Sequence, residues 1–163
     1  MKQKKAKFFW KKNNSLKEIS CIEYNDEIEY YSFLKNCHSQ GYRQIIITSE
    51  LMIEIVKYFV MEKNLSVIKI ELAEDDHELK EELKFLIEQT IRDRVFFQQL
   101  IEKLYFLAEQ SSIDIQRVYI KGRNHEKAAI NFFIQSNGII GVNIDSFKSI
   151  SNDIKKIIEG YLS

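Results

Sequence analysis

The segment from residue 43 to residue 72 changes its hydrophobic period twice, and this pattern constrains the fold more than any other feature of the chain. Residues 43–48 contain three consecutive isoleucines, which indicates a strand buried on both faces. Residues 50–63 place apolar side chains on one side of a helix, and residues 66–72 have the composition of another strand. The short joints between these elements predict a βαβ unit, whose two strands run parallel with a right-handed crossover.

A β-hairpin is predicted at the start of the chain. Residues 7–11 and residues 16–24 have the composition of strands, and residues 12–15 between them have the composition of a turn. The basic start of the chain would then form half of this hairpin. Lysines on an edge strand prevent edge-to-edge aggregation, which is one explanation of their presence.

An antiparallel meander is predicted near the end of the chain. Residues 113–121 indicate a strand, and Asn137-Gly138 separates two further strand-like segments, residues 129–135 and residues 139–144. Asn and Gly are the residues that best tolerate the positive φ required at both positions of a two-residue hairpin turn. We therefore expect a tight hairpin there.

Helices are predicted in three further places. Residues 26–38 carry apolar side chains at helical spacing and end before Gly41, and Ser151 is expected to cap a final helix. Nothing breaks a helix in residues 75–110, but the apolar stripe changes face after residues 92–94. One kinked helix, two consecutive helices, or a helix buried on two sides would each explain that change.

These elements predict a mixed α/β (α+β) fold in a single globular domain of 163 residues. The expected parts are a βαβ-containing half (residues 1–73), a helical middle (residues 75–110), and an antiparallel meander closed by a helix (residues 113–163). We expect one mixed sheet, or two sheets that share the middle helices.

Composition and missing motifs argue against several classes of protein. Two cysteines are too few for a disulfide framework, and their spacing matches no zinc site. The chain contains no glycine-rich phosphate loop, no G-x-S-x-G elbow and no H-E-x-x-H motif. No apolar segment approaches the roughly 20 residues of a membrane helix, and no secretory signal is recognised, so we expect a cytoplasmic protein with no membrane partner.

The basic start of the chain is the first candidate binding site. Six of the first twelve residues are lysines, and the net charge of the whole chain is zero, so the remainder is acidic. Lysines attract phosphates, but a sequence pI near 6.8 predicts at most weak, salt-sensitive contact with nucleic acid. The residues proposed to contact nucleic acid or a protein partner are Lys4, Lys5, Lys7, Lys11, Lys12, Arg117, Lys121, Arg123 and Lys127.

The carboxyl ends of the predicted parallel strands are the second candidate site, because open α/β sheets bind ligands there. Glu71, Asp75 and Asp76 follow one of these strands. Carboxylates gathered there would hold Mg²⁺ beside a phosphate substrate. Acids before a helix more commonly cap it and complement its dipole, and a helix is expected to begin at this point.

The third candidate is the connection at residues 121–127 between two strands of the meander. It supplies cations, an amide and His125, a candidate acid or base. No nucleophile or partner for His125 can be assigned from the sequence, and many such loops are solvated turns.

The expected function is a non-enzymatic cytoplasmic binding or regulatory protein. It would act, without a cofactor, through a surface that contacts an unknown protein partner or, weakly, nucleic acid. The alternative is a Mg²⁺-dependent phosphoryl-transfer enzyme or nuclease that uses the acidic cluster. A close pair of carboxylates in a cleft with basic residues beside it would favour the enzyme.

Overall fold

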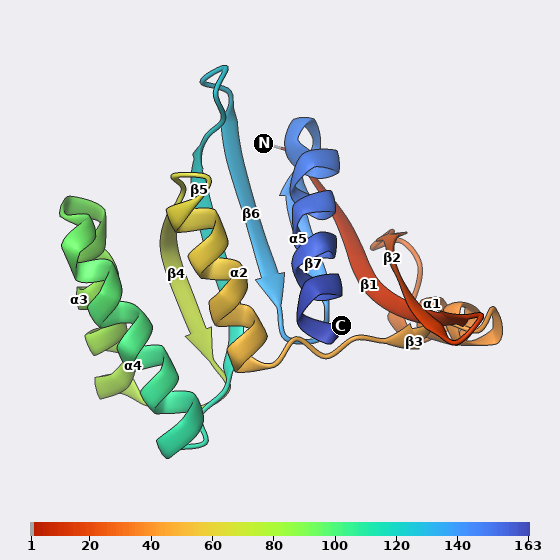
Figure 1. The fold of residues 1–163 in the computed structure, drawn as a ribbon, viewed down its shortest axis with the longest axis horizontal. Coiled ribbons are helices and arrows are strands. Elements are labelled where there is room, and N and C mark those ends of the chain that lie inside the picture. The colour runs from red at the N-terminus through yellow and green to blue at the C-terminus, as the bar shows by residue number, and fades with distance from the viewer. Residues whose placement is uncertain (1) are drawn as a thin grey trace.

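The computed structural model describes residues 2–163, which form a seven-stranded antiparallel sheet and five α-helices (Figure 1). The strands are β1 (Gln3–Asn13), β2 (Leu16–Tyr24), β3 (Arg43–Gln44), β4 (Ser66–Leu72), β5 (Ile115–Arg123), β6 (Ala129–Gln135) and β7 (Ile139–Asn143). The helices are α1 (Tyr30–Ser39), α2 (Ser49–Met61), α3 (His77–Arg92), α4 (Phe97–Gln110) and α5 (Phe147–Leu162). The strand order is β2-β1-β7-β6-β5-β4, with β3 beside β1. The expected mixed α+β composition is confirmed.

The predicted βαβ unit is wrong, because every strand pair in the described residues is antiparallel. The two-residue β3 pairs with β1, whereas β4 pairs with β5 at the opposite edge of the sheet. The three isoleucines are not all buried: Ile46 is 65% exposed, while Ile45 and Ile47 are 4% and 1% exposed. The amide of Ile47 donates to the carbonyl of Ser136 over 2.7 Å, so this segment fastens the start of α2 to the β6–β7 turn.

The predicted hairpin at the start of the chain is confirmed. Asn13 pairs with Leu16, and the two residues between them, Asn14 and Ser15, have φ values of 49° and 73°. These positive values are typical of the two-residue turns that match the twist of the flanking strands. The edge-strand explanation of the lysines is wrong, because β1 lies between β2 and β7 inside the sheet.

The hairpin at Asn137-Gly138 is also confirmed, but its turn is longer than predicted. Ile134 pairs with Ile140, and the amide of Gly138 donates to the carbonyl of Gln135 over 3.0 Å. Gly138 has a φ of 84°, and Asn137 is not in the positive-φ region. This is a longer connection with one left-handed glycine.

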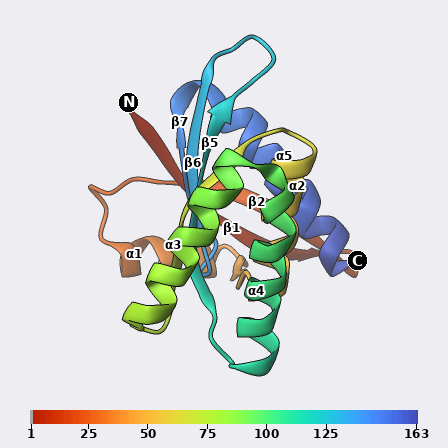
Figure 2. The same cartoon turned by 90° about the vertical axis from the view of Figure 1, so that its left-hand side faces the viewer.

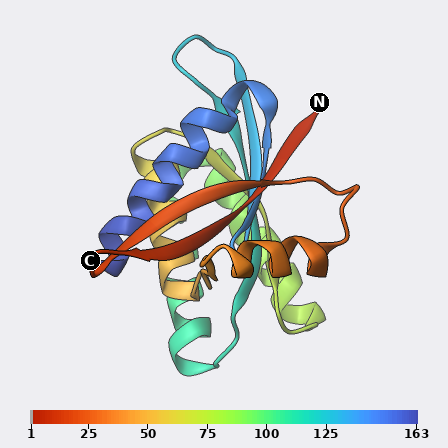
Figure 3. The same cartoon turned by 90° about the vertical axis from the view of Figure 1, so that its right-hand side faces the viewer.

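The helices cover the two faces of the sheet unequally. Helices α2 and α5 lie on one face (Figure 1), and the pair α3 and α4 extends the core beyond β4 (Figure 2). Helix α1 packs on the opposite face, over β1 and β2 (Figure 3). In the described part of the chain, no helix covers that opposite face over β5, β6 and β7.

Local hydrogen bonds set the helix boundaries. Asp93 ends α3 in an extended conformation, and its carboxylate accepts the amide of Val95 over 3.0 Å, so residues 75–110 form two consecutive helices. Helix α1 begins later than predicted, because Glu29 caps it. Helix α5 begins earlier than predicted, and Ser151 is a buried residue inside it.

None of the helices in residues 2–163 has both the length and the apolar composition needed to cross a membrane.

Candidate functional site

The alternation of side chains along β5 and β1 brings cations to the face of the sheet opposite α2 and α5. Val118 and Ile120 of β5 are buried in the core, so Arg117, Tyr119 and Lys121 point to the other side. On β1, Ala6 and Phe8 are in the core, and Lys5 and Lys7 take the opposite direction. We name this side of the sheet from β4 to β1 the basic sheet face and define it by the strand residues Lys5, Lys7, Lys69, Glu71, Arg117, Tyr119, Lys121, Asn131, Phe133, Gln135 and Gly141.

The strand register makes these residues neighbours. Tyr119 lies between Lys69 on β4 and Phe133 on β6, and Phe133 lies opposite Gly141 on β7. Gly141 in turn lies opposite Lys5 on β1. The basic sheet face therefore spans five strands, with five cations and one carboxylate among its defining residues.

Arg117 is held in one orientation at the end of this face that lies beside the β6–β7 turn. Its Cζ atom lies 4.7 Å from the centroid of the Phe133 ring. One guanidinium nitrogen donates to the Tyr119 hydroxyl over 2.8 Å, and another donates to Oε1 of Gln135. The Tyr119 hydroxyl donates in turn to Oε1 of Glu71 over 3.1 Å. The ring contact and these hydrogen bonds fix the guanidinium in place.

Gly141 makes the position of the Phe133 ring possible. A Cβ atom at residue 141 would clash with the edge of that ring. The absence of a side chain there lets Phe133 lie against β7, where it is only 7% exposed. Arg117 therefore rests on a buried aromatic support.

A hollow of about 230 Å³ lies beside Arg117. Its walls are Glu71, Gln116, Arg117, Gln135, Ser136 and Asn137. The Nε2 atom of Gln135 donates to Oδ1 of Asn137 over 3.0 Å, which fixes one wall. The hollow thus combines a planar cation, a carboxylate and several amide groups.

Lys7 is a buried cation of the basic sheet face. Its side chain has no exposed surface, its Nζ atom donates to the carbonyl of Asn137, and it lies 5.8 Å from the Phe9 ring centroid. Burial lowers the pKa of Lys7 to about 8. Lys7 therefore connects β1 to the β6–β7 turn and is not accessible to a partner.

The other lysines of the basic start do not form one patch with it. Lys4 pairs with Glu23 over 2.8 Å and lies 5.1 Å from the Phe147 ring centroid, on the opposite side of β1. Lys11 lies 4.9 Å from the Tyr42 ring centroid, and Lys12 is exposed. Because successive side chains of a strand point to opposite faces, the predicted lysine cluster is divided between the two sides of β1.

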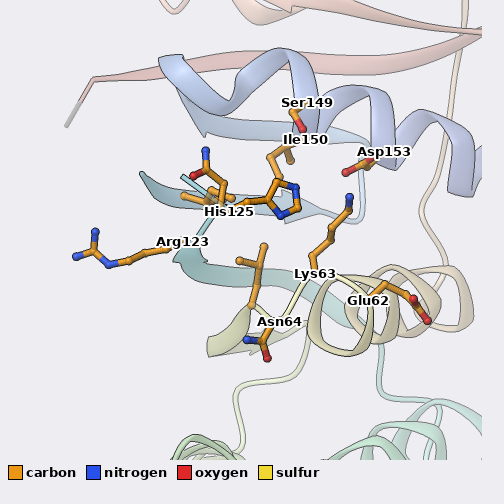
Figure 4. Close-up of a pocket in the computed structure, with 11 residues that line it drawn as sticks. Glu62, Lys63, Asn64, Arg123, His125, Ser149, Ile150 and Asp153 are labelled. Carbon is orange, nitrogen blue, oxygen red and sulfur yellow. The ribbon is translucent and has the colours of Figure 1, made fainter. Parts of the chain in front are cut away.

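The tip of the β5–β6 hairpin holds the remaining predicted residues. Arg123 donates to the carbonyl of Lys127 over 2.8 Å. His125 lines a hollow of about 330 Å³, and Figure 4 shows the side chains of His125, Lys63 and Asp153 directed into it from three elements. The hollow supplies His125 with charged neighbours that the sequence did not reveal.

The predicted acidic residues lie around one hollow, and two of them also have structural roles. Asp76 caps α3, accepting the amide of Leu79 over 3.1 Å, and Glu71 belongs to the network around Arg117. Asp75 is exposed and lines a hollow of about 300 Å³ with Glu71, Asp76 and Lys80. Within residues 2–163, no group of three metal-binding side chains is close enough to hold an ion.

The start of α2 and the end of β4 were expected to lie together at the carboxyl ends of two parallel strands. They do lie together, but for a different reason. Ser49 donates to Oδ1 of Asp114 over 3.2 Å, and the amide of Ala73 donates to the carbonyl of Asp114 over 2.9 Å. The residue just before β5 thus joins the start of α2 to the end of β4. Antiparallel pairing of β4 with β5, rather than a parallel pair, brings them together.

Sequence reasoning identified Arg117 and Lys121 but missed Tyr119, Phe133 and Gln135. The signal in β5 was present, because residues 117, 119 and 121 alternate with apolar residues. The contribution of β6 depends on strand register, which no short motif revealed.

Comparison with known proteins found no matching family model, no similar curated protein and no similar solved structure.

Proposed function

We propose that the chain is a cytoplasmic, non-enzymatic binding protein that holds an anionic partner on the basic sheet face. One observation carries this proposal: Lys69 of β4 and Arg117 and Lys121 of β5, with Glu71 as the one carboxylate among the defining residues, share a face that no helix in the described residues covers over β5, β6 and β7. The chain as a whole has no net charge, so this face is more basic than the rest of the molecule. Such a concentration of charge attracts an oppositely charged partner and speeds its association.

The accessible cations of this face are few and well defined. Lys121 is exposed, and no ion pair involves it within the described residues. Lys69 is 60% exposed at its side chain, although it lies 3.3 Å from Glu71. These two residues flank Tyr119 and are the exposed cations that β4 and β5 contribute to this face.

Labelled inorganic polyphosphate provides the direct test, because it carries charge but no bases. We expect the double variant Lys69→Gln with Lys121→Gln to weaken polyphosphate binding by about tenfold at low ionic strength. The matched control is Lys84→Gln with Lys156→Gln, which removes two exposed lysines from α3 and α5. Equal weakening by both double variants, or no binding by the wild type, would overturn the proposal.

A second candidate, a Mg²⁺-dependent phosphoryl-transfer enzyme, has one observation in its favour. Glu71, Asp75 and Asp76 line the same hollow, with Lys80 beside them. Two of these acids are already engaged, Asp76 as a helix cap and Glu71 as an acceptor for Tyr119. Binding at the basic sheet face is therefore the better supported function.

A further inference from the structure

We infer that the anionic partner is a single-stranded nucleic acid and that one of its bases enters the hollow beside Arg117. This inference rests on the proposed function, because it names the ligand of the same basic sheet face. Charge alone would fit a nucleic acid or an acidic peptide. The groups around the hollow distinguish the two.

Arg117 lines the hollow with a guanidinium group that is held in place by its neighbours. It rests on the Phe133 ring, with 4.7 Å between Cζ and the ring centroid, and two hydrogen bonds hold it there. Arg117 is also a wall of the hollow. Proteins that bind single strands stack unpaired bases on guanidinium planes and aromatic rings. A base in this hollow would lie against the guanidinium group that Phe133 supports.

The other walls of the hollow carry groups that match the edge of a base. Gln116, Gln135 and Asn137 present amide groups, and Glu71 presents a carboxylate. The edge of a base carries both donors and acceptors, and a carboxylate accepts hydrogen bonds from exocyclic amino groups. Glu71 would repel a phosphate, so the hollow suits a base and the surrounding lysines suit the backbone.

The exposed charges of the face lie where the backbone of such a strand would run. Lys69 lies 5.5 Å from the Tyr119 ring centroid, and Lys121 is two residues beyond Tyr119 on β5. Both lysines lie on the same side of the hollow along β5, so phosphates that follow the bound base in that direction would lie near them. A paired base cannot leave its stack without losing its partner, so a duplex fits this arrangement less well.

Fluorescence anisotropy with labelled oligonucleotides of equal length tests the inference. We expect single-stranded DNA or RNA to bind roughly tenfold more tightly than an abasic strand or a duplex, because stacking of one base is lost. A polyglutamate peptide of the same charge should bind no more tightly than the abasic strand. Equal binding of the intact and abasic strands, or tighter binding of the duplex or the peptide, would overturn the inference.

Two variants separate base binding from charge. Arg117→Lys keeps the positive charge and removes the plane, so the preference for intact over abasic strands should disappear while polyphosphate binding remains. Gln116→Leu changes an exposed wall residue outside the Arg117 hydrogen bonds, and it should weaken binding of intact strands without changing the melting temperature. An unchanged preference in both variants would overturn the inference. Binding of polyphosphate without any base preference leaves the proposed function standing, whereas no binding of any polyanion contradicts both.

Discussion

The Nζ atom of Lys7 donates a hydrogen bond to the main-chain carbonyl of Asn137, joining residues 130 positions apart in the sequence. The lysine has no exposed surface, and burial lowers its pKa from 10.5 to about 8. The charged form is therefore less favourable in the folded protein than in the unfolded chain. Because of this difference, the free energy of unfolding changes with pH in the alkaline range.

The sign of that dependence follows from proton binding. Between pH 8 and pH 10.5 the unfolded chain retains the Lys7 proton more fully than the folded protein, so this group makes stability rise with pH. We expect the difference in free energy of unfolding, wild type minus Lys7→Met, to increase across that range in urea titrations. Burial raises the pKa of Cys37, which acts in the opposite direction in both proteins, and the charge of Lys7 lowers that pKa. Lys7→Met therefore raises the Cys37 pKa further, which adds to the expected increase. A difference that stays constant with pH would contradict the prediction.

Gly138 and Gly160 provide a matched pair of substitutions. Gly138 has a φ of 84°, and a Cβ atom there would lie 2.9 Å from the carbonyl oxygen of Ile45. We expect Gly138→Ala to lower the free energy of unfolding by more than ~1 kcal/mol, because both strain and a close contact oppose it. At Gly160 in α5, a Cβ atom would meet nothing within 4 Å apart from its chain neighbours and the backbone of its own helix, so Gly160→Ala should raise stability by about 0.5–1 kcal/mol. Urea midpoints measure both changes, and a neutral Gly138→Ala would contradict the turn conformation.

Local turn chemistry explains which parts of the fold could be predicted from the sequence. The Asn14-Ser15 turn and the turn that ends at Gly138 contain residues with positive φ, and both hairpins were found, although the second turn is longer than the two residues predicted. The order of the strands was not predictable in this way. Residues 3–7 of β1 pair with residues 139–143 of β7, and no local pattern records a contact over that distance.

The isoleucines at residues 45–47 show why the central prediction was wrong. A continuous apolar run is compatible with a strand buried on both faces, but here only Ile45 and Ile47 enter the core. The candidate site was predicted only in part, because it too depends on contacts between strands. Its cations could be identified individually in the sequence, whereas the support of Arg117 by Phe133 depends on the pairing of β5 with β6.

Substitutions of the adjacent residues Asp76 and Asp75 should differ in their effect on the stability of the fold. The Asp76 carboxylate accepts the amide of Leu79 over 3.1 Å at the start of α3, whereas Asp75 is exposed and lies one residue outside the cap. We expect Asp76→Ala to cost about 1 kcal/mol of stability and Asp75→Ala to change it little. Thermal melts of the two variants check this, and equal losses would show that the cap is not the cause.

Divalent metal distinguishes the two candidate functions. A metal that binds only the folded protein raises its melting temperature by mass action. If binding at the basic sheet face is the function, Mg²⁺ and Mn²⁺ should leave the melting temperature unchanged. A clear increase that Asp75→Asn with Asp76→Asn abolishes would favour the metal-dependent enzyme instead.

The salt dependence of oligonucleotide binding should identify the face that carries the contact. Each phosphate neutralised on a single strand contributes about −0.7 to the slope of log K against log salt. Lys121→Gln should therefore make the slope shallower by about 0.7, because Lys121 lies exposed on the basic sheet face. Lys12→Gln should leave the slope unchanged, because Lys12 alternates with Lys11 and points to the other side of β1. Anisotropy titrations at several salt concentrations measure both slopes. A change in slope with Lys12→Gln and none with Lys121→Gln would place the contact on the opposite face. Affinity that persists at physiological salt and does not vary with salt concentration would exclude a phosphate contact altogether.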